Sequence, residues 1–124
     1  MLEIKTHHVT GVPEYVRIFP DGDKGQGGAH TKYLISLGVP GGRESGSQTA
    51  LRFQNGSAQE VGPNGVTNEA VLAVVIDRLK GFQQGELSCR ENAIALTHLE
   101  TALLWLQQRT RDRIERGVEG KIKL

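Results

Sequence analysis

The sequence of 124 residues is poor in cysteine and aromatic residues and has no long hydrophobic run. Its one cysteine, Cys89, excludes an internal disulfide and a zinc site built from several cysteines. The longest uninterrupted apolar stretch, Ala70 to Ile76, is far too short to cross a bilayer. The N-terminal segment MLEIKTHHV lacks the apolar run of a signal peptide, so we expect a cytoplasmic protein.

Neither sign of charge is in excess. The 15 basic and 14 acidic residues give a net charge of +1, which argues against a nucleic-acid or membrane surface over the whole protein. Glycine is abundant, and 12 of its 16 residues lie before position 66. Composition and periodicity together predict an N-terminal β part over residues 1–65 and a C-terminal helical part over residues 66–117, sharing one structural unit.

Alternating and β-branched residues predict a small antiparallel sheet in the N-terminal part. Asn55-Gly56 is typical of a type I′ turn, in which both central residues have positive φ, so it is expected to join two strands as a hairpin. The segments 21–28 and 38–48 are rich in glycine and polar residues and are expected to be loops. The expected strands cover residues 2–7, 14–19, 31–37, 50–54 and 57–61.

Residues 66–117 carry the sustained helical periodicity of the chain. Thr67 is the expected N-cap of a first helix, and Ser88 with Glu91 matches the capping box of a second helix. Gly117 is the expected residue after that second helix. Apolar side chains recur at three- and four-residue spacings, at Val71, Leu72, Val75, Ile76, Leu79 and Phe82 and again at Leu96, Leu99, Leu103 and Leu106.

The second helix is predicted to be about 28 residues or ~42 Å long, which is several turns longer than the first. Its apolar side therefore needs a cover beyond the first helix, and a second subunit is the simplest source. The predicted fold class is α+β, with a small N-terminal antiparallel β-sheet followed by a C-terminal two-helix antiparallel hairpin.

The sequence holds no recognisable catalytic motif. It lacks a G-x-S-x-G elbow, a paired-carboxylate motif and a catalytic triad pattern. The glycine-rich segment 22–28 lacks the Lys-Ser/Thr pair of a P-loop. His7, His8 and His30 have no cysteine or carboxylate at zinc-site spacing, so surface or packing roles are expected for them. We therefore expect no enzyme, no catalytic residues, and no bound metal or cofactor.

Four residues of the helical part form a candidate ligand site. Phe82 lies at a helix end, where its ring can stack on a base or simply pack against the helix. Asn92 lies in register with apolar positions, so its amide needs a partner, either a ligand or a capping hydrogen bond. Arg109 and Arg113 suit a phosphate, although their spacing, continued by Arg116, also suits a solvated salt-bridge face. Together these residues predict a possible site for a nucleotide-like anion.

Specific segments follow one another between residues 53 and 120. They are GVTNE (Gly65–Glu69), IDRL-x-GFQ (Ile76–Gln83), CRENA (Cys89–Ala93), WL-x-x-RT-x-DR (Trp105–Arg113) and RGVEG (Arg116–Gly120). In this order they resemble the phage anti-defence family that sequesters Thoeris signalling molecules. That family shares its helical hairpin with the phage anti-CBASS cyclic-nucleotide sponges.

The resemblance implies a protein that binds a cyclic ADP-ribose isomer or a related cyclic nucleotide signal without degrading it, in the cytoplasm of the host bacterium. It also implies a homo-oligomer, from dimer to hexamer, whose ligand sites between subunits use Phe82, Asn92, Arg109 and Arg113. Neither nucleic acid nor membrane is an expected partner. Two alternatives stay open, a sponge for the cyclic di- or trinucleotides of CBASS immunity and a structural adaptor whose hairpin only oligomerises.

Overall fold

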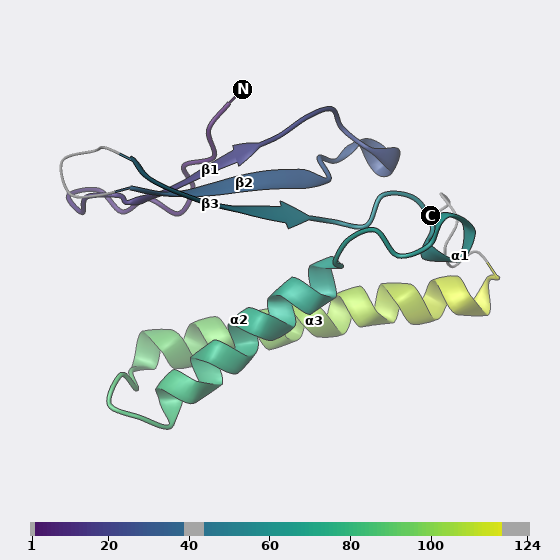
Figure 1. The fold of residues 1–124 in the computed structure, drawn as a ribbon. Coiled ribbons are helices and arrows are strands. Elements are labelled where there is room, and N and C mark those ends of the chain that lie inside the picture. Colours follow the sequence, from purple (N-terminus) through teal and green to yellow (C-terminus); the bar gives the residue numbers. More distant parts are fainter. Residues whose placement is uncertain (1, 39–43, 118–124) are drawn as a thin grey trace. The chain divides into compact units, whose positions relative to one another are not determined.

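The computed structural model describes residues 2–38 and 44–117 of the chain. The chain divides into two compact units, residues 1–65 and residues 66–124. The first unit holds a three-stranded sheet and the second holds a pair of long helices (Figure 1). The α+β class predicted from the sequence, with the sheet preceding the helical hairpin, is confirmed.

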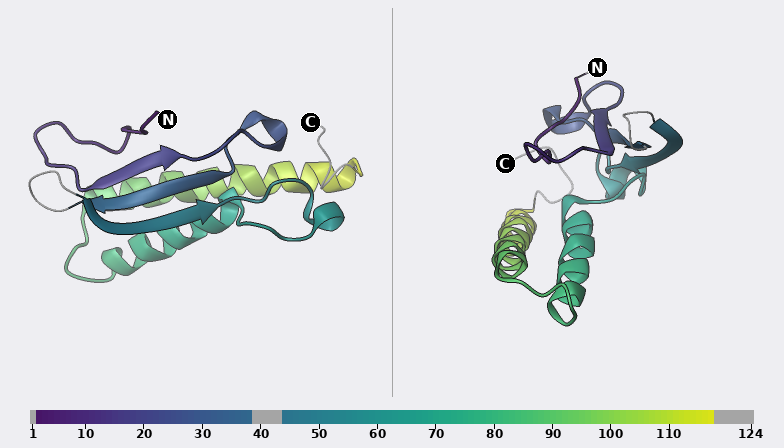
Figure 2. Two further views of the ribbon diagram at one scale, coloured as in Figure 1. Left: turned by 45° about the horizontal axis from the view of Figure 1, so that its top comes forward. Right: turned by 90° about the vertical axis from the view of Figure 1, so that its left-hand side faces the viewer.

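The first unit is built on an antiparallel sheet, whose strands lie side by side in Figure 2. β-Branched residues suit this pleated surface, and Ile18 lies opposite Ile35 in the register of the first two strands. The strands expected over residues 14–19 and 31–37 are confirmed with small shifts of their bounds. The strands are, in spatial order, β1 (Val16–Pro20), β2 (Lys32–Gly38) and β3 (Glu44–Arg52).

Two expectations for strand positions are wrong. Residues 2–7, all of them described, form no strand, because Ile4 alone bridges to Ile18 and the chain then turns with His8 N–H donating to Lys5 O at 3.0 Å. β3 begins at Glu44, inside a segment predicted to be a loop. Its residues 47–50 are exposed, so no apolar alternation marks them as a strand. Residues 39–43 of the predicted loop lie outside the described residues.

The predicted hairpin at Asn55-Gly56 is also wrong. Gly56 has φ +84°, but no described non-glycine residue has positive φ, so Asn55 does not form a type I′ turn. In place of a returning strand, the chain forms the short helix α1 (Ala58–Val61). Its N-cap Ser57 accepts a hydrogen bond from Gln59 N–H at 3.2 Å.

Side-chain amides explain this departure from a hairpin. The Oε1 atom of Gln54 accepts from Asn64 N–H at 2.9 Å, and the Oδ1 atom of Asn64 accepts from Asn55 N–H at 2.8 Å. The Nδ2 atom of Asn64 also donates to Asn55 O at 2.8 Å. These bonds satisfy backbone groups that a second strand would otherwise pair, so the amide-rich sequence competes with hairpin formation.

The second unit is a helical hairpin of α2 (Asn68–Gln83) and α3 (Arg90–Glu115). Thr67 is the N-cap of α2, as predicted, and its Oγ1 atom accepts from Ala70 N–H at 3.1 Å. Gly117 follows the C-cap of α3 with φ +70°, which confirms the predicted end of this helix. Within the described residues, no helix has both the length and the apolarity needed to cross a membrane.

The beginning of α3 differs from the prediction by one residue. Its N-cap is Cys89, not Ser88, and the Cys89 Sγ atom accepts from Asn92 N–H at 3.4 Å. Gln83 fixes this boundary, because its side chain donates to Cys89 O and accepts from Cys89 N–H, both at 3.1 Å. Ser88 N–H donates to Gly85 O instead, so Ser88 belongs to the turn between the helices.

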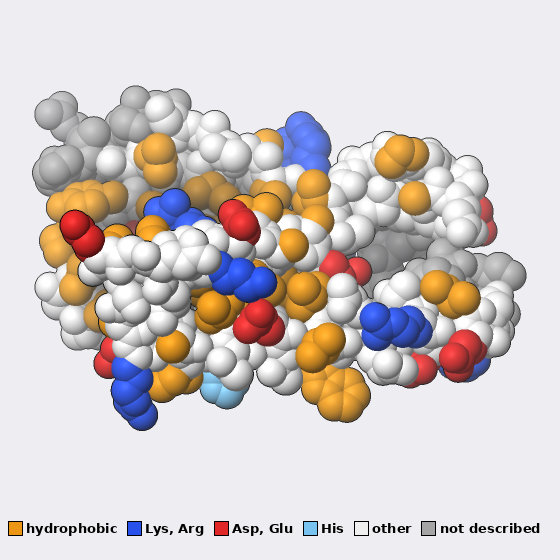
Figure 3. All heavy atoms as spheres, turned by 90° about the horizontal axis from the view of Figure 1, so that it is seen from below, with side chains coloured by type: hydrophobic (Ala, Val, Ile, Leu, Met, Phe, Trp, Pro, Cys, Tyr) orange, Lys and Arg blue, Asp and Glu red, His pale blue; other side chains and the backbone are white. Residues whose placement is uncertain are grey.

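Hydrophobic burial is sparse in the described part of the chain. Ile76 of α2, 6% exposed, is the one buried hydrophobic residue there. Figure 3 shows hydrophobic side chains among basic and acidic ones on one face of the surface. The large exposed hydrophobic residues of the hairpin are Val74, Val75, Leu87, Ile94, Leu104, Trp105 and Ile114.

Candidate functional site

Phe82 and Asn92 lie where α2 turns into α3, a region that we call the turn end (Phe82, Gln83, Cys89 and Asn92). Phe82 is in the last turn of α2, and Asn92 is the third residue of α3. The two hydrogen bonds between Gln83 and Cys89 tie the last residue of α2 to the residue that caps α3. The structure therefore brings Phe82 and Asn92 to the same end of the hairpin.

The half-buried ring of Phe82 meets a cation from its own helix. The guanidinium carbon of Arg78 lies 4.8 Å from the centroid of the Phe82 ring, in a cation–π contact. The two residues are four positions apart, so they share a face of α2. Sequence reasoning missed Arg78, although this spacing is visible in the sequence. The contact places a positive charge beside a ring that is suited to stacking on a base.

The amide of Asn92 already has a partner within the hairpin. Its Nδ2 atom donates to Leu87 O at 3.2 Å, so a local hydrogen bond of the kind considered from the sequence is present. This bond fixes the orientation of the amide, whose Oδ1 atom can still accept a hydrogen bond from a ligand. Asn92 therefore closes the turn and presents a polar atom in a defined direction.

Arg109 lines an open groove on α3 with a volume of about 490 Å³, which we call the groove end. Trp105 is 71% exposed there and offers a flat ring to a ligand. The Nε2 atom of Gln108 donates to Asp112 Oδ1 at 2.9 Å, across one turn of the helix. Two carboxylates also line the groove and repel an anion. An anion therefore has to enter on the side of the arginines. The groove end comprises Trp105, Gln108, Arg109, Asp112, Glu115 and Arg116.

Arg113 lies one turn beyond Arg109 in a different environment. Arg113 is only 5% exposed, whereas Arg109 is exposed. Burial of a guanidinium is costly unless the group is paired, and pairing restrains the side chain. A fully solvated face of Arg109, Arg113 and Arg116, the alternative considered from their spacing, does not hold for Arg113.

The four predicted site residues do not meet within one chain. Asn92 and Arg109 are 17 residues apart on the continuous helix α3. At a rise of 1.5 Å per residue, about 25 Å of helix separates them. Phe82 shares the end of Asn92, and Arg113 lies still farther along α3. A single chain thus holds two separate groups of candidate residues, the turn end and the groove end.

Trp105 is a groove residue that sequence reasoning did not propose as a ligand contact. It comes two residues after Leu103, so it lies about 200° around the helix from that half-buried position. A tryptophan outside the apolar stripe, four residues before an arginine, was the available signal. Trp105 also lines a second depression of about 450 Å³, together with Thr101, Leu104, Gln108 and Arg111.

The first unit contains a cluster that the sequence did not predict. The Nε2 atom of His7 lies 3.8 Å from Glu14 Oε2, so a carboxylate lies beside this histidine although none stands at zinc-site spacing in the sequence. Sequence spacing hid this contact, because the chain turns back between the two residues, with Val12 N–H donating to Val9 O at 3.1 Å. The cluster belongs to the sheet unit, whereas the four predicted site residues belong to the hairpin.

The helical hairpin, with a ring and an amide at one end and arginines at the other, defines the class of protein. Residues 48–111, just over half of the chain, match the family model described as the Acb2/Tad1 hairpin domain. The matched segment contains Phe82, Asn92 and Arg109. The protein belongs to the Acb2/Tad1 hairpin family, which confirms the resemblance drawn from the sequence motifs.

A known relative resembles a large part of the chain. Thoeris anti-defense 1 of Bacillus phage SBSphiJ7 is 53% identical to the chain over 76 residues. The alignment covers 61% of this chain and 54% of the relative, so the chain spans about half of the relative's length.

Proposed function

We propose that this protein is a phage anti-defence protein that sequesters a cyclic ADP-ribose-type immune signal without degrading it. The observation that carries the proposal is the placement of a ring-and-amide half-site and an arginine half-site on one hairpin of the Acb2/Tad1 family. The name of the relative, Thoeris anti-defense 1, supports the same role. The protein acts in the cytoplasm of the host bacterium, where it intercepts the signal before its effector.

The groove end suits the pyrophosphate of such a ligand. Arg109 can donate two parallel N–H bonds to phosphate oxygens, a geometry that lysine cannot reproduce. Arg113 lies one helical turn away but is buried and does not line this groove, so in a single chain it adds positive charge near the phosphates without a direct contact. The exposed ring of Trp105 borders the same groove and can shield the phosphates from water.

The turn end suits the base and the ribose. The ring of Phe82 stacks on the purine, and Arg78 adds a cation next to that stack. The Oδ1 atom of Asn92 accepts a hydrogen bond from a base N–H or a ribose hydroxyl. Because hydrogen bonds from Gln83 and Asn92 close the turn, these groups are in place before the ligand arrives.

Different chains supply the two half-sites. About 25 Å of helix separates Asn92 from Arg109. A single ligand of the cyclic ADP-ribose type is too small to contact both residues of one chain. An antiparallel pairing of two hairpins places the turn end of one copy beside the groove end of the other. The exposed Ile94, Leu104 and Trp105 of α3 give such an interface apolar surface. The expected assembly ranges from this dimer to a hexamer built from such pairs.

Sequestration requires no chemical step. The proposed contacts are a ring, an amide and guanidinium groups, which stack, accept hydrogen bonds and bind anions. None of them is a nucleophile or a general base in the usual sense. We therefore expect the ligand to be released from the protein chemically unchanged.

Calorimetry with cyclic ADP-ribose isomers tests the proposal. A protein that removes a sub-micromolar signal needs a nanomolar Kd, equivalent to about −12 kcal/mol. We expect saturable heat with at least one isomer, and recovery of unchanged ligand after heat denaturation. A folded, oligomeric protein that gives no heat with any isomer contradicts the proposal, and recovery of a cleaved ligand shows a hydrolase.

Two alternatives have observations in their favour. The family name also includes Acb2, which favours cyclic di- or trinucleotides of CBASS immunity as ligands, and these belong in the same titrations. The exposed hydrophobic residues of the hairpin favour an adaptor that only oligomerises. An adaptor keeps its biological activity when Phe82 or Asn92 is replaced by alanine, whereas a sponge loses that activity with its fold retained.

A further inference from the structure

His7, His8 and Glu14 converge in the sheet unit, outside the helical hairpin. One possible ligand atom from each of these residues lies within 4.8 Å of the other two. The two histidines are exposed and Glu14 is half-buried, so an ion can reach the cluster from solvent. The rings of His7 and His8 lie edge to face, with centroids 4.6 Å apart. Two imidazoles and a carboxylate are a typical ligand set for zinc and neighbouring transition metals.

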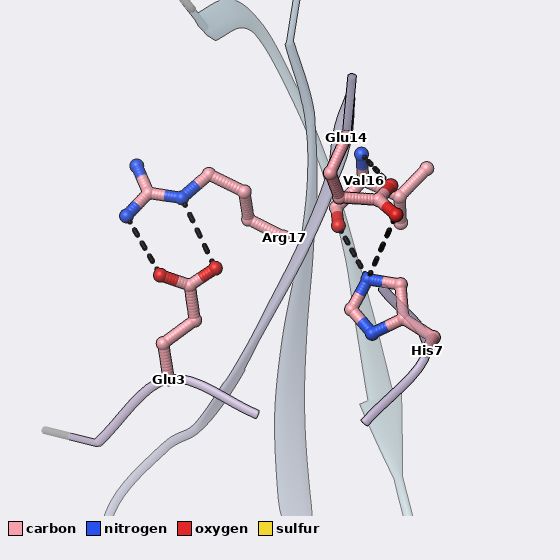
Figure 4. Close-up of polar contacts among 5 residues, drawn as sticks. All are labelled: Glu3, His7, Glu14, Val16 and Arg17. Carbon is pink, nitrogen blue, oxygen red and sulfur yellow. Dashed lines mark hydrogen bonds and ion pairs between the residues drawn. The ribbon is translucent and has the colours of Figure 1, made fainter. Parts of the chain in front are cut away.

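Backbone contacts hold two of these side chains in place (Figure 4). The Nε2 atom of His7 lies 2.7 Å from Val16 O and 3.8 Å from Glu14 Oε2. The other carboxylate oxygen, Glu14 Oε1, accepts from Val16 N–H at 2.8 Å. The beginning of β1 therefore orients both His7 and Glu14, and Glu14 keeps one oxygen directed toward the imidazole.

We propose that His7, His8 and Glu14 form a binding site for a divalent transition-metal ion of the zinc type. The ion binds His7 at Nε2, where it replaces the hydrogen bond to Val16 O while the ring proton moves to Nδ1. One nitrogen of His8 and the Glu14 carboxylate also bind the ion, with water completing four-coordination. The proposal is independent of the nucleotide-binding function, since its residues lie in the other unit.

The distances allow this site after small movements. Bonds of about 2.0–2.1 Å in a tetrahedral zinc site place neighbouring ligand atoms about 3.3 Å apart. The separation of 3.8 Å between His7 Nε2 and Glu14 Oε2 is close to this value. The widest separation in the cluster, 4.8 Å, needs a contraction that rotation of the exposed His8 side chain can supply.

Both cations and carboxylates surround the cluster, so the proposal rests on its geometry and not on local charge. The pKa of Glu3 is lowered, first by its hydrogen bond to Arg17 and also by the charges of Arg17, Lys5 and His8. His8 is therefore within electrostatic reach of a second carboxylate, in addition to Glu14. Glu3 itself is engaged with Arg17 at 3.0 Å, apart from the proposed ligand set (Figure 4). A bound ion would connect the N-terminal segment to the beginning of β1.

Titration of the untagged full chain with ZnCl2 at pH 7.5 tests the site by calorimetry. We expect one ion per chain, and visible absorption of tetrahedral Co²⁺ when cobalt is used as the probe. His8→Gln is the decisive variant, because it spares the His7–Val16 and Glu14–Val16 hydrogen bonds. Loss of a direct ligand is expected to weaken binding by at least about tenfold, the lower bound measured for outer-shell changes. Glu14→Gln, which keeps an oxygen for Val16 N–H, is expected to do the same.

His98→Ala is the matched control, since His98 is an exposed histidine of α3. It should keep the wild-type affinity for Zn²⁺. The midpoint temperature of unfolding, Tm, should rise with Zn²⁺ in the wild type and in His98→Ala, and stay constant in His8→Gln. Equal affinities of the wild type and His8→Gln overturn the proposal, as does a wild type that binds no Zn²⁺. Either result leaves nucleotide binding by the hairpin untouched.

Discussion

The two ends of the helical hairpin hold their proposed ligand-binding groups in different environments. At the turn end each group already has a partner, because Arg78 covers the Phe82 ring and Leu87 O fixes the Asn92 amide. At the groove end Arg109 is exposed, and Trp105 is 71% exposed beside an open groove. If a ligand binds as proposed, it meets one group of residues that is organised in advance and has to order the other. We expect the conformational cost of binding to fall mainly on the groove end.

Replacement of Arg109 by alanine should have the largest effect on nucleotide affinity. Loss of a guanidinium that pairs with a desolvated phosphate costs about 2–5 kcal/mol, which is roughly 30-fold or more in Kd. Calorimetry with the cyclic ADP-ribose isomer that the wild type binds measures the loss, and circular dichroism checks the fold. Arg111→Ala is the control, because Arg111 is exposed on the same helix about 200° away from Arg109.

A mixed oligomer shows whether the two ends act across subunits. Asn92→Ala and Arg109→Ala chains each spoil one half-site, so neither homo-oligomer should bind the ligand tightly. Co-expression of the two chains should restore part of the binding capacity, because some sites then combine an intact turn end with an intact groove end. If hetero-oligomers form but binding capacity is not restored, the proposal that different chains supply the two half-sites is wrong.

Loss of the Phe82 ring should have the next largest effect. Stacking of an aromatic side chain on a base contributes about 1–3 kcal/mol, so Phe82→Ala should raise Kd by about fivefold to 150-fold. Phe82→Leu keeps apolar volume and removes the aromatic face, so it separates stacking from packing. An affinity of Phe82→Leu equal to that of the wild type would rule out stacking as the role of this ring.

Gln83→Ala tests whether the turn end is organised in advance. This substitution removes two hydrogen bonds to Cys89, each contributing about 0.5–1.5 kcal/mol to stability, with the low end expected for exposed groups. Urea unfolding should show a loss of about 1 kcal/mol, and ligand affinity should fall with it. Gln84→Ala, one residue later in the exposed turn, should leave both quantities near wild type.

The smallest effect on nucleotide affinity is expected at the ion pair of Glu3 and Arg17, which lies outside the helical hairpin. The hydrogen bond from Arg17 holds the pKa of Glu3 below its ordinary value of 4.5. This pair therefore contributes stability above pH 4.5, and the contribution is lost as the pH falls through the lowered pKa. Glu3→Gln should flatten this acid dependence in thermal unfolding. Nucleotide affinity at neutral pH should not change.

The helices were more predictable than the sheet unit because their signals are local. The Thr67 cap, the three-and-four spacing of apolar residues and Gly117 each act within a turn of the backbone they control. The loop after β3 depends instead on Gln54 and Asn64, which bond across ten residues. Asn55-Gly56 alone suggested a hairpin, and only those distant amides explain why none forms.

The residues of the candidate site could be predicted from the sequence, but their contacts and burial could be predicted only in part. The resemblance pointed to Phe82 and Asn92, but not to the cation of Arg78 on that ring or the bond from Asn92 to Leu87 O. The spacing of the arginines on α3 was visible, whereas the burial of Arg113 depends on tertiary packing. Glu14 escaped notice beside His7 for the same reason, because a turn brings the two residues together.

Trp105 gives the groove end an optical signal of its own. The sequence has a single tryptophan, so the indole emission of the protein comes from this position alone. Because the ring is 71% exposed in one chain, covering it in an assembly moves the emission to shorter wavelength as protein concentration rises. A base or a phosphate entering the groove alters the emission at constant concentration. Spectroscopy of the unlabelled protein can thus follow assembly and ligand capture as separate events.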